Sequence, residues 1–307
     1  MKKLIALLMI ISFIYAGNAH ALFDTSNWGV RPLGMGAAFT AVADDASGPL
    51  YNIAGIAVME KPEVTFMSAR LAVVSDGYDL GTDYLAFVYP ISEKWGSVSA
   101  AWSYFGDPGL RREDTINLGY ARTLNDLEIW DEMDLSVGIN GKYVRQEVDF
   151  GESASGGGKE SKGGLTFDIG VLARFSYGIS FGFSSKYITR PDVGYFMEDK
   201  VPSMNVIGFA YYTEKVPILK IPEFTIAADY EMRTGDENMM KIGAETRLID
   251  GSLALRAGGW SEQINFGIGY GLDIAGSKVS IDYAFGLPLE MQETMGSHFL
   301  SLSFRFP

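Results

Sequence analysis

Residues 296–306 read GSHFLSLSFRF, and two kinds of side chain alternate along them. In an extended strand, Leu300 and Leu302 fall on one face, whereas Ser301 and Ser303 fall on the other. Strict alternation with a period of two is typical of a β-strand that has one apolar and one polar face. The stretch therefore predicts a strand whose two sides meet different surroundings.

The same alternation recurs through most of the chain after residue 61. It is clear in residues 239–248, 262–272 and 277–285, and it identifies about fourteen candidate strands. They begin near Glu63, Thr82, Gly96, Glu113, Met133, Gly164, Gly178, Ser203, Glu223, Met239, Gly251, Glu262, Ser277 and Gly296. Each is about ten residues long, the length that crosses an outer membrane when tilted. We therefore expect an all-β fold, a transmembrane antiparallel β-barrel of about 14 strands.

The connections between these strands alternate in length, as expected if they lie on opposite sides of a membrane. Short turns are predicted at residues 92–95, 176–177, 250–251 and 275–276, and long loops at residues 149–162, 190–202 and 287–295. Short periplasmic turns and longer outer loops are the pattern of outer-membrane barrels. The connections at residues 123–132 and 214–221 fit less well, because they are long although they fall on the short-turn side.

A soluble exported β-sandwich or propeller would also contain short alternating strands. Two features favour the membrane barrel. The apolar faces are uniform along the chain, whereas the edge strands of a sandwich would have weaker patterns. Aromatic residues also recur at predicted strand ends, where they would form an interfacial girdle. These residues are Tyr84, Trp102, Tyr143, Tyr212, Tyr230, Trp260, Tyr270 and Tyr283.

The N-terminus has the pattern of a secretory signal. Lys2 and Lys3 precede an apolar segment, residues 4–16, which is short for a transmembrane helix, and residues 19–21 read AHA, like a cleavage site. A short membrane anchor is the alternative. We expect residues 1–21 to be a signal peptide, and together with the barrel pattern this places the mature protein in the bacterial outer membrane.

Composition argues against several classes of function. The formal net charge is −13, with 25 Lys and Arg against 38 Asp and Glu, so nucleic acid is not an expected partner. The chain has no Cys, and His298 is its only His after residue 21, so neither a catalytic triad nor a metal site is expected. Acidic loops at residues 76–83 and 236–238 could bind Ca²⁺, but such residues more often keep a loop soluble. We therefore expect no enzyme activity and no cofactor.

Residues 22–61 are different from the rest of the chain, because they are rich in Gly and Ala and do not alternate. A barrel of about eight strands is filled by its own side chains, and one of about sixteen or more encloses an aqueous channel. The lumen of a fourteen-stranded barrel lies between these sizes, so without a plug it would let small solutes through. We expect residues 22–61 to be a small N-terminal plug, or hatch, with one or two helical turns at residues 37–43, and residues 62–307 to be the barrel.

Residues 33–57, LGMGAAFTAVADDASGPLYNIAGIA, resemble the N-terminal signature of the FadL/TodX outer-membrane transport superfamily, including its PorV/PorQ-like branch. The matching positions are Gly34, Met35, Gly36, Ala43, Asp44, Asp45, Ala46, Ser47, Asn52, Ala54 and Gly55. At Ile53 this chain departs from the signature, which usually has Pro. The resemblance implies a fourteen-stranded barrel with a hatch, in which these residues other than Ala43 and Ala46 gate the passage of a ligand.

The resemblance also implies two functions, which stay open at this point. FadL-like members pass hydrophobic small molecules such as long-chain fatty acids, and the expected partners are that ligand and outer-membrane lipid. PorV/PorQ-like members act in protein secretion or surface attachment, and the partners would then be proteins of a secretion system. A barrel with a purely structural role is a third alternative.

Charged side chains fall on the polar faces of the predicted strands and are expected to point into the lumen. A polar wall is predicted on the late strands, formed by Lys241, Glu245, Arg247, Arg256 and Arg305. Asp134, Lys142, Asp168, Asp229, Glu231 and Asp282 are predicted to face inward as well. The wall could anchor the plug or guide a charged head group. Alternatively, it is a solvated lumen with neutralising ion pairs.

Overall fold

The structure is a computed structural model, and it describes residues 28–71, 80–107, 109–125, 132–151, 158–216, 221–289 and 295–307. The predicted signal peptide, residues 1–21, lies outside the described residues, as do residues 22–27. No helix in the described part of the chain is long and apolar enough to cross a membrane.

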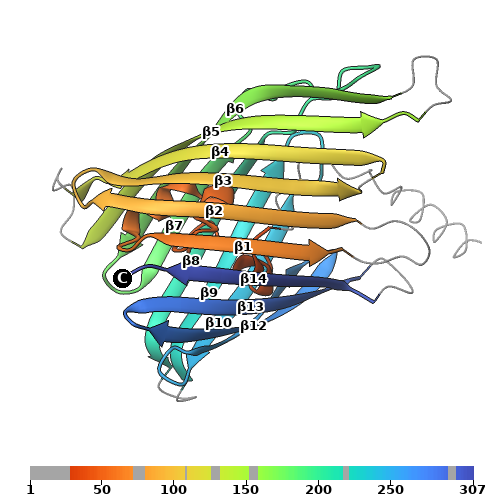
Figure 1. Ribbon diagram of the computed structural model, residues 1–307. Coiled ribbons are helices and arrows are strands. Elements are labelled where there is room, and N and C mark those ends of the chain that lie inside the picture. The colour runs from red at the N-terminus through yellow and green to blue at the C-terminus, as the bar shows by residue number, and fades with distance from the viewer. Residues whose placement is uncertain are drawn as a thin grey trace, which may run out of the picture.

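Fourteen antiparallel strands form a closed barrel, in which each strand pairs with its neighbours in sequence and β1 pairs with β14 (Figure 1). In chain order they are β1 (Glu63–Arg70), β2 (Gly81–Ser92), β3 (Gly96–Asp107), β4 (Arg111–Thr123), β5 (Met133–Asp149), β6 (Lys159–Phe175), β7 (Ile179–Lys186), β8 (Met204–Val216), β9 (Ile221–Arg233), β10 (Met239–Leu248), β11 (Leu253–Trp260), β12 (Gln263–Ile274), β13 (Ser277–Pro288) and β14 (Ser297–Arg305). The predicted fold class and strand number are confirmed.

The strand boundaries differ most from prediction at β5 and β6, which are 17 residues long each. Their ladder continues to the pair Asp149 and Lys159, so β6 begins five residues before the predicted Gly164. Residues 159–162 read KESK and have no apolar face. Because such a stretch gives no period-two signal, the part of the ladder that continues beyond the apolar alternation was missed.

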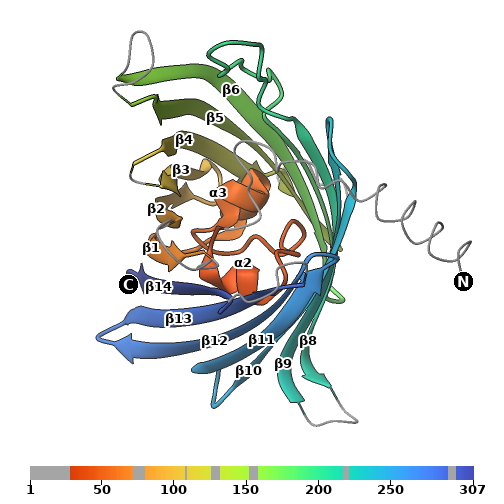
Figure 2. The same ribbon diagram turned by 90° about the vertical axis from the view of Figure 1, so that its right-hand side faces the viewer.

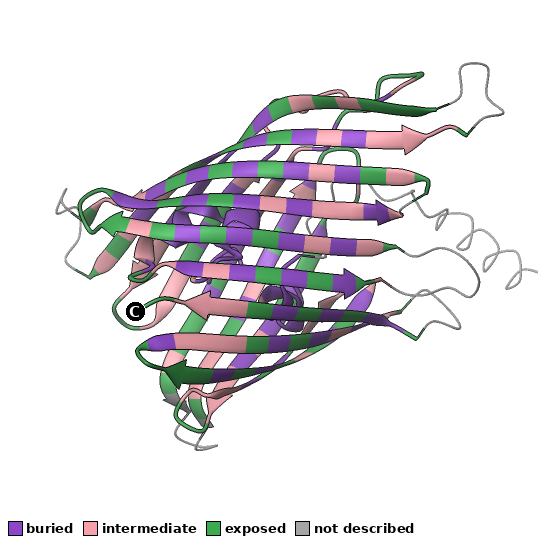
Figure 3. Cartoon of the chain, in the orientation of Figure 1, coloured by how far each residue is buried: buried purple, intermediate pink, exposed green. Residues whose placement is uncertain are grey.

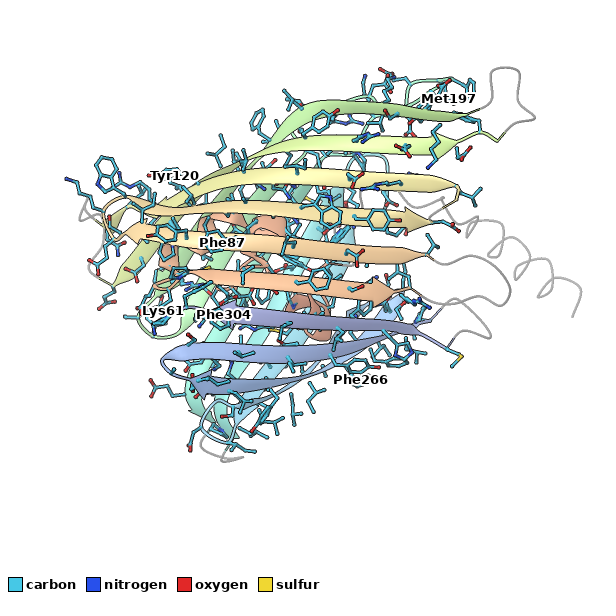
Figure 4. All side chains as sticks on the ribbon, in the orientation of Figure 1. Lys61, Phe87, Tyr120, Met197, Phe266 and Phe304 are labelled. Atoms are coloured by element: carbon cyan, nitrogen blue, oxygen red, sulfur yellow. The ribbon has the colours of Figure 1, made fainter. Side chains whose placement is uncertain are left out.

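The outside of the barrel is apolar and the inside is polar or packed, so buried and exposed residues alternate along the strands (Figure 3). On β6, for example, Leu165 is 75% exposed and the neighbouring Thr166 is 5% exposed. Phe87 and Phe266 lie on the outer surface, as Figure 4 shows. A closed barrel with an apolar exterior is a membrane barrel, and the soluble sandwich or propeller alternative is wrong.

The predicted aromatic girdle is only partly correct. Tyr84 points into the lumen, where its hydroxyl donates to the backbone oxygen of Ala46 at 2.9 Å. Trp260 packs against the buried core, and Tyr212 lines a cavity between the wall and the plug. These three residues stand at inward positions of their strands. Aromatic residue type alone does not reveal this, because an inward ring can serve the core.

Residues 28–59 of the predicted plug lie inside the barrel, and we call them the hatch (Figure 2). It contains α2 (Val30–Gly34), α3 (Gly48–Tyr51) and the 3₁₀-helix η1 (Ile53–Val58). Residues 37–43 form turns rather than a regular helix, and only one turn closes by the helical pattern, with the Ala43 N–H donating to the backbone oxygen of Phe39 at 2.9 Å. The turn extends no further because Ala37 and Ala43, at the two ends of the stretch, have φ angles of 57° and 34°, which a right-handed helix does not allow.

Candidate functional site

The hatch contributes most residues of the larger of the two buried apolar clusters. Leu33, Met35 and Phe39 are fully buried, and the rings of Phe39 and Tyr51 meet edge-on with their centroids 5.5 Å apart. The Tyr51 hydroxyl donates to the backbone oxygen of Trp28 at 2.7 Å. The centre of the lumen is therefore filled by the packed side chains of the hatch rather than by a loosely packed loop.

The inner surface of the barrel, which we call the wall, meets the hatch through eight inward-facing glycines, one on each of eight strands. We call these residues the glycine ring. They are Gly119, Gly138, Gly170, Gly182, Gly208, Gly243, Gly258 and Gly267, on β4 to β8 and β10 to β12. A Cβ atom added to any of them would lie 3.0 Å or less from an atom of the hatch. Non-bonded carbon atoms prefer about 3.5–4.0 Å, so no side chain fits at these positions without a shift. The hatch therefore rests directly on the strand backbones.

Gly34, Met35 and Gly36 of the N-terminal signature lie at this contact. Gly36 has a φ angle of 60°, and a Cβ atom there would lie 2.5 Å from the backbone oxygen of Ile242 on β10. Gly34 faces the glycine ring, whereas Gly55 packs against Ala43 inside the hatch. Met35 is fully buried at the end of α2. Their predicted role in gating stays a prediction, and the structure gives them a packing role.

Asn52 joins three parts of the molecule and is fully buried. Its side-chain oxygen accepts the Ala54 N–H at 3.1 Å and so caps η1. Its amide donates to the backbone oxygen of Thr40 at 2.9 Å and to that of Val171 on β6, also at 2.9 Å. Ile53, which replaces the usual proline, is buried and lies against the glycine ring.

Arg31 organises the charged residues of the signature. Its guanidinium lies 2.6 Å from Asp44, 2.9 Å from Asp45 and 2.9 Å from Glu245 of the wall. Asp45 also accepts the backbone N–H of Ser47 at 2.8 Å. Burial opposes the charged form of Arg31, but the surrounding carboxylates outweigh burial and raise its pKa well above the ordinary value. Arg31 is therefore a permanent cation that ties the hatch to the wall.

Glu245 on β10 is the centre of the charged wall. In addition to Arg31, its carboxylate forms ion pairs with the Nε atoms of Arg256 and Arg247, at 2.6 and 3.2 Å. Arg256 also contacts Asp282 on β13 at 2.6 Å. The structure thus brings together three of the five predicted wall residues.

Lys241 and Arg305, the other two, belong to separate ion pairs. Lys241 lies 2.8 Å from Glu231, which also pairs with Arg233. Arg305 on β14 lies 2.6 Å from Glu63 on β1. The predicted wall is therefore three groups of paired charges rather than one continuous site.

Sequence reasoning missed three anchors of the hatch. Arg31 is the only Lys or Arg in residues 28–59, a signal that could have identified it as the partner of a wall carboxylate. Glu63 accepts the N–H of Ala46 at 3.0 Å. Asp229, predicted only to face inward, accepts the successive N–H groups of residues 39 and 40 at 3.0 and 2.9 Å. Sequence gave no signal for which backbone groups these carboxylates bind.

The segment between β7 and β8 folds against the inner side of the barrel, where Val193 and Val201 are buried. Asp192 lies 2.8 Å from the ammonium of Lys162 on β6, and it accepts two backbone N–H groups within its own segment. The hydrogen bond from Lys162, followed by those backbone groups, holds the pKa of Asp192 well below its ordinary value. This cluster fastens the segment to the wall.

In the described part of the chain, the cavities between the hatch and the wall include three that lie near the predicted charged residues. The wall cavity, of about 80 Å³, lies beside Arg31 and is bounded by strands including β1, β13 and β14. The mouth cavity, of about 460 Å³, lies near the turn between β12 and β13. The side cavity, of about 360 Å³, lies at the turn between β6 and β7. Both of these turns are short, so the two larger cavities lie at the periplasmic end.

The described residues contain no group of three or more His, Cys, Asp or Glu side chains that could hold a metal ion. The predicted Ca²⁺ alternative at residues 76–83 lies largely outside them. His298 stands on the outer surface, with its Nδ1 atom 2.7 Å from the Tyr283 hydroxyl. This position fits an interfacial side chain.

Comparison with known proteins identifies the fold. No protein-family model matches the sequence, and no curated protein matches it either. Among solved structures, the toluene transporter TbuX of Ralstonia pickettii is similar, with a TM-score of 0.60, 10% identity, and coverage of 92% of this chain and 99% of that one. The P. putida toluene transporter TodX has the same values. A Pseudomonas aeruginosa FadL homologue has a TM-score of 0.55, 12% identity, and coverage of 92% and 98%.

These structures confirm the FadL/TodX resemblance at the level of fold. The similarity of fold extends over 92% of this chain and 98–99% of each of the others, although few residues are identical. The proteins compared are described as transporters or as a FadL homologue, and none of them as an enzyme.

Proposed function

We propose that this chain is an outer-membrane channel through which hydrophobic small molecules pass. The observation that carries the proposal is a fourteen-strand barrel with an apolar exterior and a packed lumen, in the fold of two toluene transporters and a FadL homologue. A plugged barrel excludes free diffusion of water-soluble molecules, so passage requires selective entry and a movement of the hatch.

The finer proposal is that the cargo includes long-chain fatty acids rather than neutral hydrocarbons alone. Its support is the charge in the lumen. Arg247, Lys278 and Arg305 line the wall cavity beside the hatch, where Arg247 shares Glu245 with two other arginines. A carboxylate head group can compete for such cations, whereas toluene cannot.

Uptake by whole cells tests both statements. The full chain is expressed in a bacterium that lacks its own channel for hydrophobic compounds, and uptake of radiolabelled oleate and toluene is measured. Heat-dependent mobility of the outer-membrane fraction on gels confirms that the barrel is folded. We expect oleate uptake well above that of the empty host. Uptake of toluene alone would contradict the fatty-acid statement, and uptake of neither compound by a folded barrel would contradict the channel.

The secretion-linked alternative gains no support from the structures compared above. The same cells separate it from the channel. A protein partner recovered at one-to-one ratio by cross-linking, in cells that take up neither compound, would favour secretion or surface attachment.

A further inference from the structure

The three cavities beside the hatch are adjacent. Lys278 and Arg305 line both the wall cavity and the mouth cavity. Asp44 and Arg174 line both the mouth cavity and the side cavity. Together the cavities form a crevice that begins beside Arg31 and reaches the periplasmic end. Lys278 and Arg305 stand at its narrow junction.

Two like charges face each other at this junction. Lys278 on β13 and Arg305 on β14 are direct partners in the strand register. Both stand at inward positions, because both line the wall cavity. Like charges directly opposite one another on one sheet face destabilise the pair. An anion between them would remove that cost.

Charge pairing leaves Lys278 without a close carboxylate. Arg305 is engaged by Glu63 at 2.6 Å, whereas Lys278 has no ion pair within 4.0 Å among the described residues. Its other register partner, Asp273, is exposed at the rim of the barrel and lies beyond that distance. Its ammonium therefore adds an uncompensated positive charge to the crevice.

The carboxylates that line the wall cavity already have cationic partners, Asp45 with Arg31, Glu63 with Arg305 and Asp282 with Arg256. Glu245 is shared by three arginines, among them Arg247, which also lines the wall cavity. Asp282 holds Arg256 at 2.6 Å. The free hydrogen-bonding capacity that remains is mostly donor capacity, from Lys278, the guanidinium of Arg247 and the hydroxyl groups of Ser280 and Ser301. Cations together with hydroxyl donors suit an oxyanion.

We propose that the junction of the wall and mouth cavities is an oxyanion site, with Lys278, Arg247 and Arg305 as its cationic ligands and Ser280 as a hydroxyl donor. The ligand chemistry is a carboxylate or phosphate group. It arrives either as a free ion from the periplasmic end or as the head group of an amphiphile in the crevice. The site does not depend on which molecule crosses the hatch.

Binding to the purified full chain in detergent tests the site, with inorganic phosphate, oleate and uncharged oleyl alcohol as probes in isothermal titration. Lys278→Gln removes the unpaired charge, and Lys278→Arg retains it. Lys94→Gln is the matched control, because Lys94 lies on a short turn at the same end of the barrel and lines none of the three cavities. Heat-dependent mobility on gels confirms that each variant is folded.

We expect oxyanion binding to weaken about tenfold or more in Lys278→Gln, as loss of a hydrogen bond from a charged donor implies. Lys278→Arg and Lys94→Gln should bind like the native chain. Binding of both phosphate and oleate, or of phosphate alone, identifies a site open to free ions. Binding of oleate but not of oleyl alcohol or phosphate identifies an amphiphile head group.

Absence of binding by both phosphate and oleate, or equal affinities in the native chain and Lys278→Gln, would overturn the site. Because titration in detergent requires no transport, its failure is distinguishable from failure of the uptake experiment.

Discussion

Replacement of Gly243 by alanine tests whether the glycine ring holds the hatch. A Cβ atom at this position on β10 would lie 2.5 Å from the carbonyl carbon of Met35 and 2.8 Å from its Cα atom. The preferred separation is about 3.5–4.0 Å, so the hatch must move by roughly 1 Å. Overpacking of this kind costs about 1–3 kcal/mol. The cost falls on docking of the hatch, because the strand itself tolerates alanine.

Gly141→Ala on β5 is the matched control. The same methyl group is added to a strand interior, but its closest contact would be the Leu118 backbone oxygen at 3.8 Å. We therefore expect Gly141→Ala to stay within about 0.5 kcal/mol of the native chain, as typical surface substitutions do.

Hydrogen exchange of hatch peptides in detergent, read by mass spectrometry, measures the effect. A cost of about 1–3 kcal/mol raises the opening constant of the hatch roughly 5- to 150-fold. Barrel peptides should keep their protection in both variants. Equal exchange of the hatch in Gly243→Ala and Gly141→Ala would refute the reasoning. If Gly243→Ala does not assemble, Gly258→Ala replaces it, since its Cβ atom would lie 2.5 Å from the same carbonyl carbon.

Three further outcomes follow from the site. Glu245→Gln should loosen the hatch by about 3–5 kcal/mol, because it removes a buried carboxylate shared by the buried Arg256 and the partly buried Arg31 and Arg247, whereas Glu147→Gln, in a more exposed pair, should change stability by at most about 1 kcal/mol. Hydrogen exchange of the hatch measures both, and equal effects would contradict the charge argument. Asn52→Asp should cost about 1–3 kcal/mol, since it keeps the helix cap but loses both donated hydrogen bonds; an unchanged thermal midpoint would count against it. The pKa of Asp192 is lowered by Lys162, so the segment between β7 and β8 should stay fastened from pH 8 down to about 4 and open only as pH falls further. Limited proteolysis against pH measures this, and Asp192→Asn should be cleaved at every pH.

The barrel could be predicted from sequence because the bilayer imposes a repeated pattern. Each crossing needs an apolar exterior, so Leu300 and Leu302 alternate with serines, and the same rule locates the other strands. Prediction failed where that constraint ends. Residues 159–162 pair without an apolar face, and Tyr84 faces the core rather than the membrane interface.

The contacts of the hatch could not be predicted in the same way. Inward positions tolerate any side chain that suits the space, so Gly267 looks like an ordinary polar-face residue until the hatch is placed against it. The charges of Glu245 and Arg305 could be assigned to the lumen, but their partners lie up to 242 positions apart in sequence. A period-two pattern contains no information about which inward residues meet a non-repeating segment.

The glycine ring has a consequence for the order in which this protein is assembled. Eight strands touch the hatch with no clearance for a side chain, so a barrel that had already closed would offer no room for the hatch to thread into it. The hatch precedes every strand in the chain, and β1 must wait for β14, the last strand, before the wall is complete. The strands therefore have to close around a hatch that is already in place. The hatch then acts as a template for closure of the barrel.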